Sequence, residues 1–160
     1  IRERRTMKAF TPVPVGDDVV RELLELAVMA PNHHETEPWR FWVVGAETIK
    51  RLSKETGDVK LLRSPTAIVA GVKRNDDPVE AEEDYAAVAC ALQNVMLAAR
   101  ARGLASFWRT PGVMEKKPFR KVLDVPANIR LIAMLHLGFP AEPLPGTPER
   151  HAATFTTWLT

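Results

Sequence analysis

Apolar and polar positions along the chain follow a helical period in some segments and a strand period in others. Val20, Leu23, Leu24 and Ala27 keep the i, i+3, i+4, i+7 spacing of an amphipathic helix, which Pro31 closes. Runs rich in aromatic and β-branched residues indicate strands. On these criteria we expect strands at 39–44, 66–72, 104–108 and 130–137, and further helices at about 47–55 and 113–123.

The longest expected helix runs from about residue 79 to residue 102, where the chain has no Pro or Gly. Arg100 and Arg102 in its last turn, followed by Gly103, are typical of a helix C-terminus. At 1.5 Å per residue this helix would span roughly 35 Å. Its second half is apolar nearly all round, so we expect burial on more than one side. One domain hardly supplies that much core, which favours a subunit interface along the helix.

The alternation of helices and strands predicts a single domain over residues 1–160, of the α+β class with a central sheet. No repeat, linker or Gly-rich phosphate loop interrupts it. The net charge is +2 and the basic residues are scattered, which argues against nucleic acid as the main partner. No apolar stretch approaches the roughly 20 residues that cross a bilayer, so no membrane partner is expected.

Cys90 is the only cysteine of the chain, which excludes an internal disulfide or a dithiol redox couple. In any redox reaction the electrons would therefore sit on a bound cofactor. A reducing cytoplasm is the simplest compartment for such a chain.

The C-terminal segment begins rich in Pro and ends with Phe155, Trp158 and Leu159. This end is β-prone and half apolar, which is unusual for a frayed terminus. We expect it to dock on another surface.

The basic stretch at residues 4–8 is the first candidate for a binding role. If the stretch is extended, Arg4, Thr6 and Lys8 project to one side over about 13 Å. Two cations and a hydroxyl in this order suit a phosphorylated ligand, because Arg forms paired hydrogen bonds with phosphate and Lys places a charge further along. Taken alone, a solvated basic terminus is the simpler interpretation.

The second candidate is the segment 30–39, with His33, His34, Glu35 and Glu37. Imidazole and carboxylate are zinc ligands, but the spacing does not match a helical zinc motif such as H-E-x-x-H. A loop that carries polar side chains toward another ligand explains the segment equally well. The spacing alone therefore assigns no metal site.

The third candidate is the segment 106–112, which contains Trp108, Arg109 and Thr110 at the end of an expected strand. Such a turn offers backbone amides to a ligand, and Arg109 could add a cation. A buried Trp beside a surface Arg is the alternative interpretation.

Taken together, these segments resemble the nitroreductase family, and most closely its short bacterial members. The resemblance covers nearly the whole chain in the correct order, and no single motif carries it. Its parts are Arg4-Arg5-Thr6 with Lys8 and Phe10 following, Ala30-Pro31 and Pro38-Trp39 leading into an apolar strand, Trp108-Arg109-Thr110, and Leu137-Gly138-Phe139-Pro140. It implies a central, mostly antiparallel sheet flanked by helices, and an intertwined homodimer with FMN at the subunit interface.

The resemblance also implies three groups of cofactor-binding residues. The group at the FMN phosphate and the flavin pyrimidine edge comprises Arg4, Arg5, Thr6 and Lys8. The group that reaches the flavin from the partner subunit comprises Asn32, His33 and Glu35. The group along the ring comprises Trp108, Arg109 and Thr110. No protein side chain is implied as catalytic, because flavin N5 carries the chemistry.

The chain departs from the family pattern at three places. Glu35 and Glu37 stand where many relatives have Asn or Ser and then Gln, which predicts a different acceptor preference. Pro111 has no backbone N–H, so an amide contact to the flavin would rest mostly on Thr110. Longer relatives place basic residues near their C-terminus on the phosphate; here Arg109 or Arg150 would have to substitute.

The activity implied by the resemblance is ping-pong electron transfer from NADH or NADPH, through FMN, to nitroaromatics, quinones or similar acceptors. The alternatives are a reductase for another acceptor, such as an enone, a halogenated aromatic or an azo compound, and a flavin-storage protein with little turnover. A metal-dependent hydrolase using His33, His34 and Glu35 is a third alternative. The sequence chooses neither the nicotinamide nor the physiological acceptor.

Overall fold

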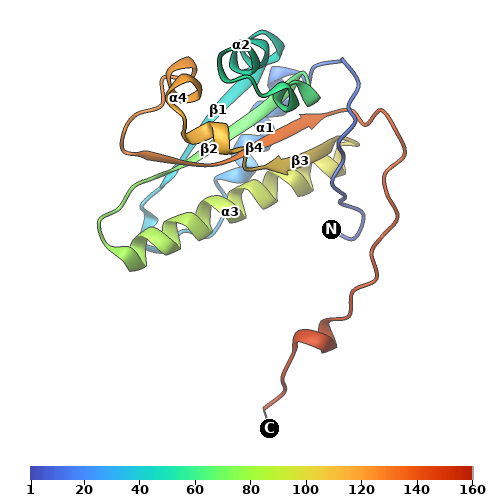
Figure 1. Ribbon diagram of the computed structural model, residues 1–160. Coiled ribbons are helices and arrows are strands. Elements are labelled where there is room, and N and C mark those ends of the chain that lie inside the picture. Colours follow the sequence, from blue (N-terminus) through green and yellow to red (C-terminus); the bar gives the residue numbers. More distant parts are fainter. Residues whose placement is uncertain (160) are drawn as a thin grey trace.

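The computed structural model describes residues 1–159, and an antiparallel sheet forms its centre (Figure 1). Within these residues the strands lie in the order β1-β2-β4-β3, and each neighbouring pair is antiparallel. Their bounds are β1 Trp39–Gly45, β2 Thr66–Lys73, β3 Ala105–Arg109 and β4 Ile129–Gly138. All the strands predicted from the sequence are present, within one or two residues of their expected ends.

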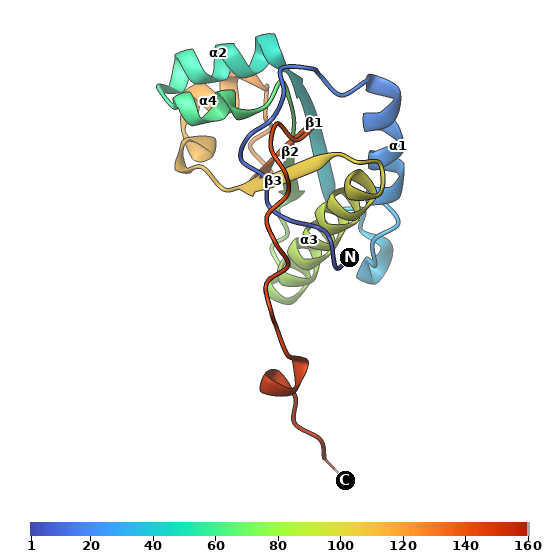
Figure 2. The ribbon, with the colours of Figure 1, turned by 90° about the vertical axis from the view of Figure 1, so that its right-hand side faces the viewer.

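Helices cover both faces of the sheet (Figure 2). One face packs against α1 and α3, and the opposite face against α2 and α4. The neighbouring β2 residues Ile68 and Val69 point into these two cores and are both fully buried, which explains why that strand is apolar without alternation. The sheet and its helical layers confirm the α+β class. The helices are α1 Asp17–Ala27, α2 Ala46–Thr56, α3 Pro78–Ala101 and α4 Lys117–Val122, with short 3₁₀ turns at His33–Glu35, Val59–Arg63, Gly112–Glu115 and Ala152–Phe155.

Helix α3 matches the predicted long helix. The Asp77 carboxylate caps it by accepting from the Val79 and Glu80 backbone N–H groups at 2.8 and 3.0 Å, and Gly103 ends it with φ +75°. Its inner side is buried under the sheet and α1, whereas Ala86 and Cys90 on its outer side are exposed. Within one chain the helix is therefore covered on one side only. Across the described residues, neither α3 nor any other helix combines the length and the apolar character needed to cross a membrane.

The prediction of one helix over 113–123 is wrong. The segment forms a 3₁₀ turn and then α4, separated by Lys116 in an extended conformation (φ −78°, ψ 144°). Pro118 explains the break, because proline is tolerated in the first turn of a helix and not in its interior.

The C-terminal segment leaves the body of the molecule and projects away from it (Figure 1). Its described part contains a 3₁₀ turn at Ala152–Phe155 and no strand within the chain itself. Phe155, Trp158 and Leu159 are 85%, 86% and 94% exposed, so nothing among residues 1–159 covers them. Thr160 lies outside the described residues. Docking of this segment on a partner stays a prediction.

Candidate functional site

The basic N-terminal stretch lies along β3. Thr6 forms a parallel bridge with Ser106, and the Met7 backbone N–H donates to the Ser106 carbonyl at 3.1 Å. Met7 is buried, whereas Thr6 and Lys8 on either side of it are exposed. Because the apolar Met7 faces the interior, its polar neighbours Thr6 and Lys8 face outward, as we expected for an extended stretch.

Arg4 and Arg5 differ in their surroundings. Arg4 follows a turn, closed by its backbone N–H donating to the Ile1 carbonyl at 3.2 Å, and its side chain is half-buried. The Arg5 side chain donates through Nε to the Gly146 carbonyl at 3.0 Å and so holds the start of the C-terminal segment. Its Nη2 group is buried without a hydrogen-bond partner among the described residues. Nη1 donates to the Arg4 carbonyl at 2.6 Å, so Nη2 is the one nitrogen of the Arg5 guanidinium without a partner among residues 1–159.

Lys8 approaches an aromatic ring on the α2 side of the sheet. Its Nζ atom lies 5.9 Å from the centroid of Phe107, and Arg63 lies 5.5 Å from the same ring. Phe107 in turn stacks on His136 of β4, with ring centroids 6.0 Å apart. A cation–π contact thus places Lys8 beside β3, and no acidic side chain among residues 1–159 forms an ion pair with it.

The third predicted group lies at the end of β3, with Trp108 and Arg109 in the strand and Thr110 directly after it. The Trp108 indole N–H donates to the Thr110 hydroxyl at 3.4 Å, and that hydroxyl donates to the Ile132 carbonyl at 3.3 Å. The Arg109 guanidinium lies inside, where it donates to Asp58 at 3.3 Å, and its side chain is 14% exposed. Arg109 is therefore committed to an internal ion pair. Arg109 and Arg150 were the two candidates to replace the C-terminal basic residues that longer relatives place on the phosphate. Of these two, Arg150 is exposed.

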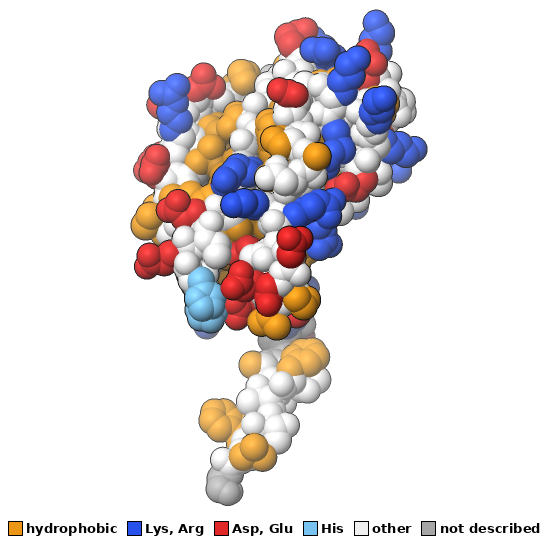
Figure 3. All heavy atoms as spheres, turned by 90° about the vertical axis from the view of Figure 1, so that its left-hand side faces the viewer, with side chains coloured by type: hydrophobic (Ala, Val, Ile, Leu, Met, Phe, Trp, Pro, Cys, Tyr) orange, Lys and Arg blue, Asp and Glu red, His pale blue; other side chains and the backbone are white. Residues whose placement is uncertain are grey.

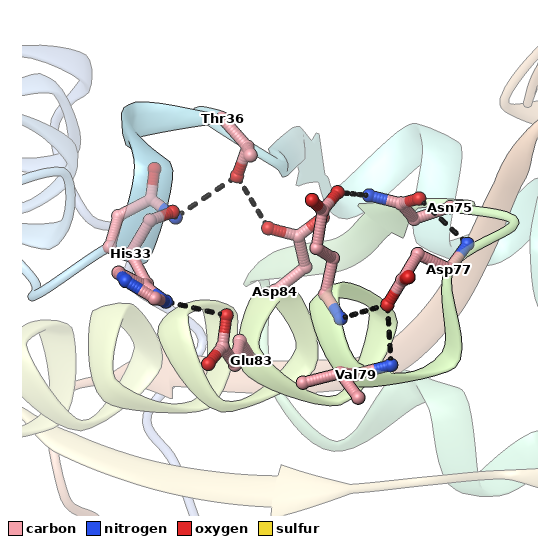
Figure 4. Close-up of polar contacts among 9 residues, drawn as sticks. His33, Thr36, Asn75, Asp77, Val79, Glu83 and Asp84 are labelled. Atoms are coloured by element: carbon pink, nitrogen blue, oxygen red, sulfur yellow. Dashed lines mark hydrogen bonds and ion pairs between the residues drawn. The ribbon is translucent and has the colours of Figure 1, made fainter.

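The segment around His33 packs on the N-terminal part of α3 (Figure 4). The Asn32 side chain joins both ends of the turn, because it donates to the Thr36 hydroxyl at 3.0 Å and accepts from the Glu37 backbone N–H at 2.8 Å. Thr36 also donates to the buried Asp84 carboxylate, and His33 Nδ1 lies 2.8 Å from Glu83 Oε2. The segment is therefore held against α3 at two successive residues.

The predicted site residues fall into two places in one chain. The N-terminal stretch and β3 lie together, and Glu3 beside them pairs with Arg100 near the end of α3 at 2.9 Å. The His33 segment instead contacts Glu83, 17 residues earlier on the same helix. At 1.5 Å per residue these contacts are about 25 Å apart along the helix axis. One chain therefore does not bring its own His33 to its own Arg4–Lys8 stretch.

His136 is a buried polar residue that the sequence interpretation did not single out. It is fully buried in β4; its Nδ1 lies 2.9 Å from the Ser64 hydroxyl, and its Nε2 has no hydrogen-bond partner among residues 1–159. Burial lowers the pKa of His136 from 6.5 to about 4, and the nearby charges of Arg109 and Arg63 act in the same direction. His136 is thus neutral near pH 7. A histidine inside an otherwise apolar strand was the only signal in the sequence.

Known proteins resemble this chain in sequence and in fold. A sequence model described as the nitroreductase family matches residues 1–60 and 52–139. The chain is 28% identical to "Putative NAD(P)H nitroreductase YfhC" of Bacillus subtilis, over 89% of this chain and 83% of that protein.

Two solved structures share the fold over almost their whole length. A nitroreductase-like family protein from Bacillus cereus superposes with a TM-score of 0.87 at 26% identity, covering 98% of this chain and 92% of that one. A "putative nitroreductase in complex with fmn" from Desulfovibrio desulfuricans superposes with a TM-score of 0.83 at 25% identity, covering 99% of this chain and 94% of that one.

Proposed function

The chain belongs to the nitroreductase family, and from that premise we propose that it is an NAD(P)H-dependent oxidoreductase that uses bound FMN to reduce small acceptors. The family match confirms the resemblance that the sequence indicated. The observation that carries the proposal is the contact between the basic stretch Arg4–Lys8 and β3, the strand that leads into Trp108-Arg109-Thr110. Two of the three residue groups assigned to the cofactor are neighbours in this fold.

The donors present along this contact suit a flavin phosphate. Arg4 and the exposed Thr6 offer a guanidinium and a hydroxyl, and Arg5 retains a buried Nη2 group that has no partner in the described part of the chain. Guanidinium pairs and hydroxyl groups are the donors that proteins use for phosphate. We assign Arg4, Arg5 and Thr6 to the phosphate and Lys8 to the ring edge.

Each remaining residue of the site has a binding or positioning task. The hydrogen bonds from Trp108 to Thr110 and from Thr110 to the Ile132 carbonyl hold the end of β3 in place. Arg109 fixes the same segment to Asp58 from the interior. When bound, the flavin supplies the ring that accepts two electrons from the nicotinamide and passes them to the acceptor. No protein nucleophile is required for that reaction.

We further propose that the working unit is a homodimer. The separation of about 25 Å along α3 means that Asn32, His33 and Glu35 can join the cofactor site only from a second chain. The exposed Phe155, Trp158 and Leu159, together with the open outer side of α3, provide apolar surface for the contact.

The acceptor class and the kinetic order are tested by one steady-state assay. Nitrobenzene and a benzoquinone are offered with NADH or NADPH, and both substrates are varied. Parallel double-reciprocal lines support a ping-pong order in which donor and acceptor use one site in turn. Intersecting lines would contradict that order, and absence of turnover with any acceptor would favour the flavin-storage alternative.

A further inference from the structure

A cluster of two histidines and a glutamate lies at the start of α3, outside the contact between the N-terminal stretch and β3. His33 and His34 come from the 3₁₀ turn, and Glu83 comes from the first turns of α3. One ligand atom from each of the three lies within 4.8 Å of the others. Figure 3 shows histidine side chains beside acidic ones on this face of the molecule, and Figure 4 shows His33 directed at Glu83.

We propose that His33, His34 and Glu83 bind a divalent transition-metal ion such as Zn²⁺. Two imidazoles and a carboxylate form an ordinary zinc ligand set, with the fourth position left to water. Tetrahedral coordination at bond lengths near 2.0–2.1 Å separates ligand atoms by about 3.3 Å. The His33 Nδ1 and Glu83 Oε2 atoms are 2.8 Å apart, and the two imidazole rings stack with centroids 3.8 Å apart. Small rotations of these side chains therefore complete the geometry.

The backbone around the cluster holds the ligands in place before any ion arrives. His34 adopts a left-handed conformation, with φ 58°, which places its ring against that of His33. Thr36 donates to Asp84, the residue after Glu83, so the loop is fixed to α3 beside the proposed ligand. Asn32 closes the turn from its other end. Fixed ligand positions reduce the conformational entropy that metal binding would otherwise cost.

This site differs from the metal alternative considered from the sequence. That alternative grouped the histidines with Glu35, two residues along the chain. The carboxylate that the fold brings to the histidines is instead Glu83, which is 50 residues from His33. Chain spacing could not reveal this third ligand. The ion would bridge the loop to α3.

Zn²⁺ titration of the tag-free protein as purified, after dialysis against a chelator, tests the site. Calorimetry should show saturable binding of one Zn²⁺ per chain, together with a higher thermal midpoint, because the ion binds the folded state. Glu83→Gln and His34→Asn should each weaken binding by at least about tenfold, which is about 1.4 kcal/mol. His33 is also among the residues that we assign to the cofactor of the partner subunit, so the test substitutes only Glu83 and His34, which have no such role. Flavin content, measured in the same samples, should therefore not change.

Two matched controls use similar side chains elsewhere. Glu82→Gln removes the neighbouring exposed carboxylate, and His151→Asn removes the exposed histidine that pairs with Glu149 at 3.2 Å, outside the three-residue cluster. Both controls should bind Zn²⁺ like the unmodified protein. Absence of saturable binding, or binding that survives Glu83→Gln unchanged, would overturn the proposal, whether or not the chain holds a flavin.

Discussion

Thr6 forms a bridge with Ser106, so the first residues of the chain run parallel to the start of β3. The buried Met7 between Thr6 and Lys8 anchors this contact. Because the anchor faces inward, the polar residues on either side of it face outward and are available to a ligand. Substitutions on the outward side should therefore change cofactor binding without removing a core contact.

Arg4→Ala should purify largely without flavin. Loss of a charge-assisted hydrogen bond to phosphate costs roughly 1.5–3 kcal/mol, which corresponds to about 10- to 150-fold in affinity. Flavin released by denaturation, divided by the chain concentration, measures the effect. Arg2→Ala, at an exposed arginine two residues earlier, serves as the control and should retain the cofactor. Full occupancy in the Arg4 variant would remove Arg4 from the phosphate site.

Lys8→Met should lower the reduction potential of the bound flavin. A nearby cation stabilises the anionic reduced ring, and methionine keeps much of the side-chain length without the charge. A spectroscopic redox titration measures the midpoint potential. The exposed Lys60 provides the matched control, Lys60→Met, which should leave the potential unchanged. An unchanged potential in the Lys8 variant would place Lys8 away from the ring.

The sequence predicted most of the fold because its elements have clear periods and ends. Gly103 follows α3 in the sequence and marks its end, and the structure gives this glycine a left-handed φ. Strand β2 is buried from Thr66 to Val72, and this part of the sequence is a short, mostly apolar run. The prediction failed at 113–123, where apolar spacing was followed across Pro118 although proline restricts where a helix can begin.

The candidate site was predicted less completely, because long-range contacts have no local signal. The resemblance identified the stretches around Arg4 and Trp108, and the fold places them side by side. The sequence could not show that the Arg109 side chain points inward, since its partner Asp58 lies 51 residues earlier. The contact between Glu83 and His33 could not be predicted for the same reason. Nor could the lowered pKa of His136, which depends on its burial in the fold.

The protein should lose stability in mildly acidic solution through His136. Its pKa is about 4 in the folded state and 6.5 ordinarily, so between these values the unfolded chain binds more protons. Stability from the neutral ring is therefore complete above about pH 6.5 and decreases as the pH falls toward 4, by about 3 kcal/mol. Urea denaturation at several pH values measures the free energy of unfolding.

His136→Asn is the comparison for that measurement, because carboxylates also titrate at low pH in both proteins. The variant removes the titrating ring and keeps a polar group near Ser64. Its free energy of unfolding should fall less between pH 6.5 and pH 4 than that of the unmodified protein. Identical pH dependence in the two proteins would show that His136 does not carry the effect.

Removal of residues 154–160 should weaken dimerisation and FMN retention together. An obligate interface buries more than about 2,000 Å² in total, and Phe155, Trp158 and Leu159 are the exposed apolar side chains of this segment. Sedimentation at micromolar concentration and flavin content measure the two effects. Thr157→Ala is the control, because it keeps the apolar side chains. A truncated protein that stays dimeric and fully loaded would exclude the segment from the interface.

Addition of NADH or NADPH to the purified protein without oxygen decides whether the chain is an FMN-dependent NAD(P)H oxidoreductase. We expect a yellow protein whose flavin absorbance is bleached by at least one of the two nicotinamides and returns when nitrobenzene or a quinone is added. A protein that binds no FMN, or one whose flavin neither nicotinamide bleaches, would contradict it.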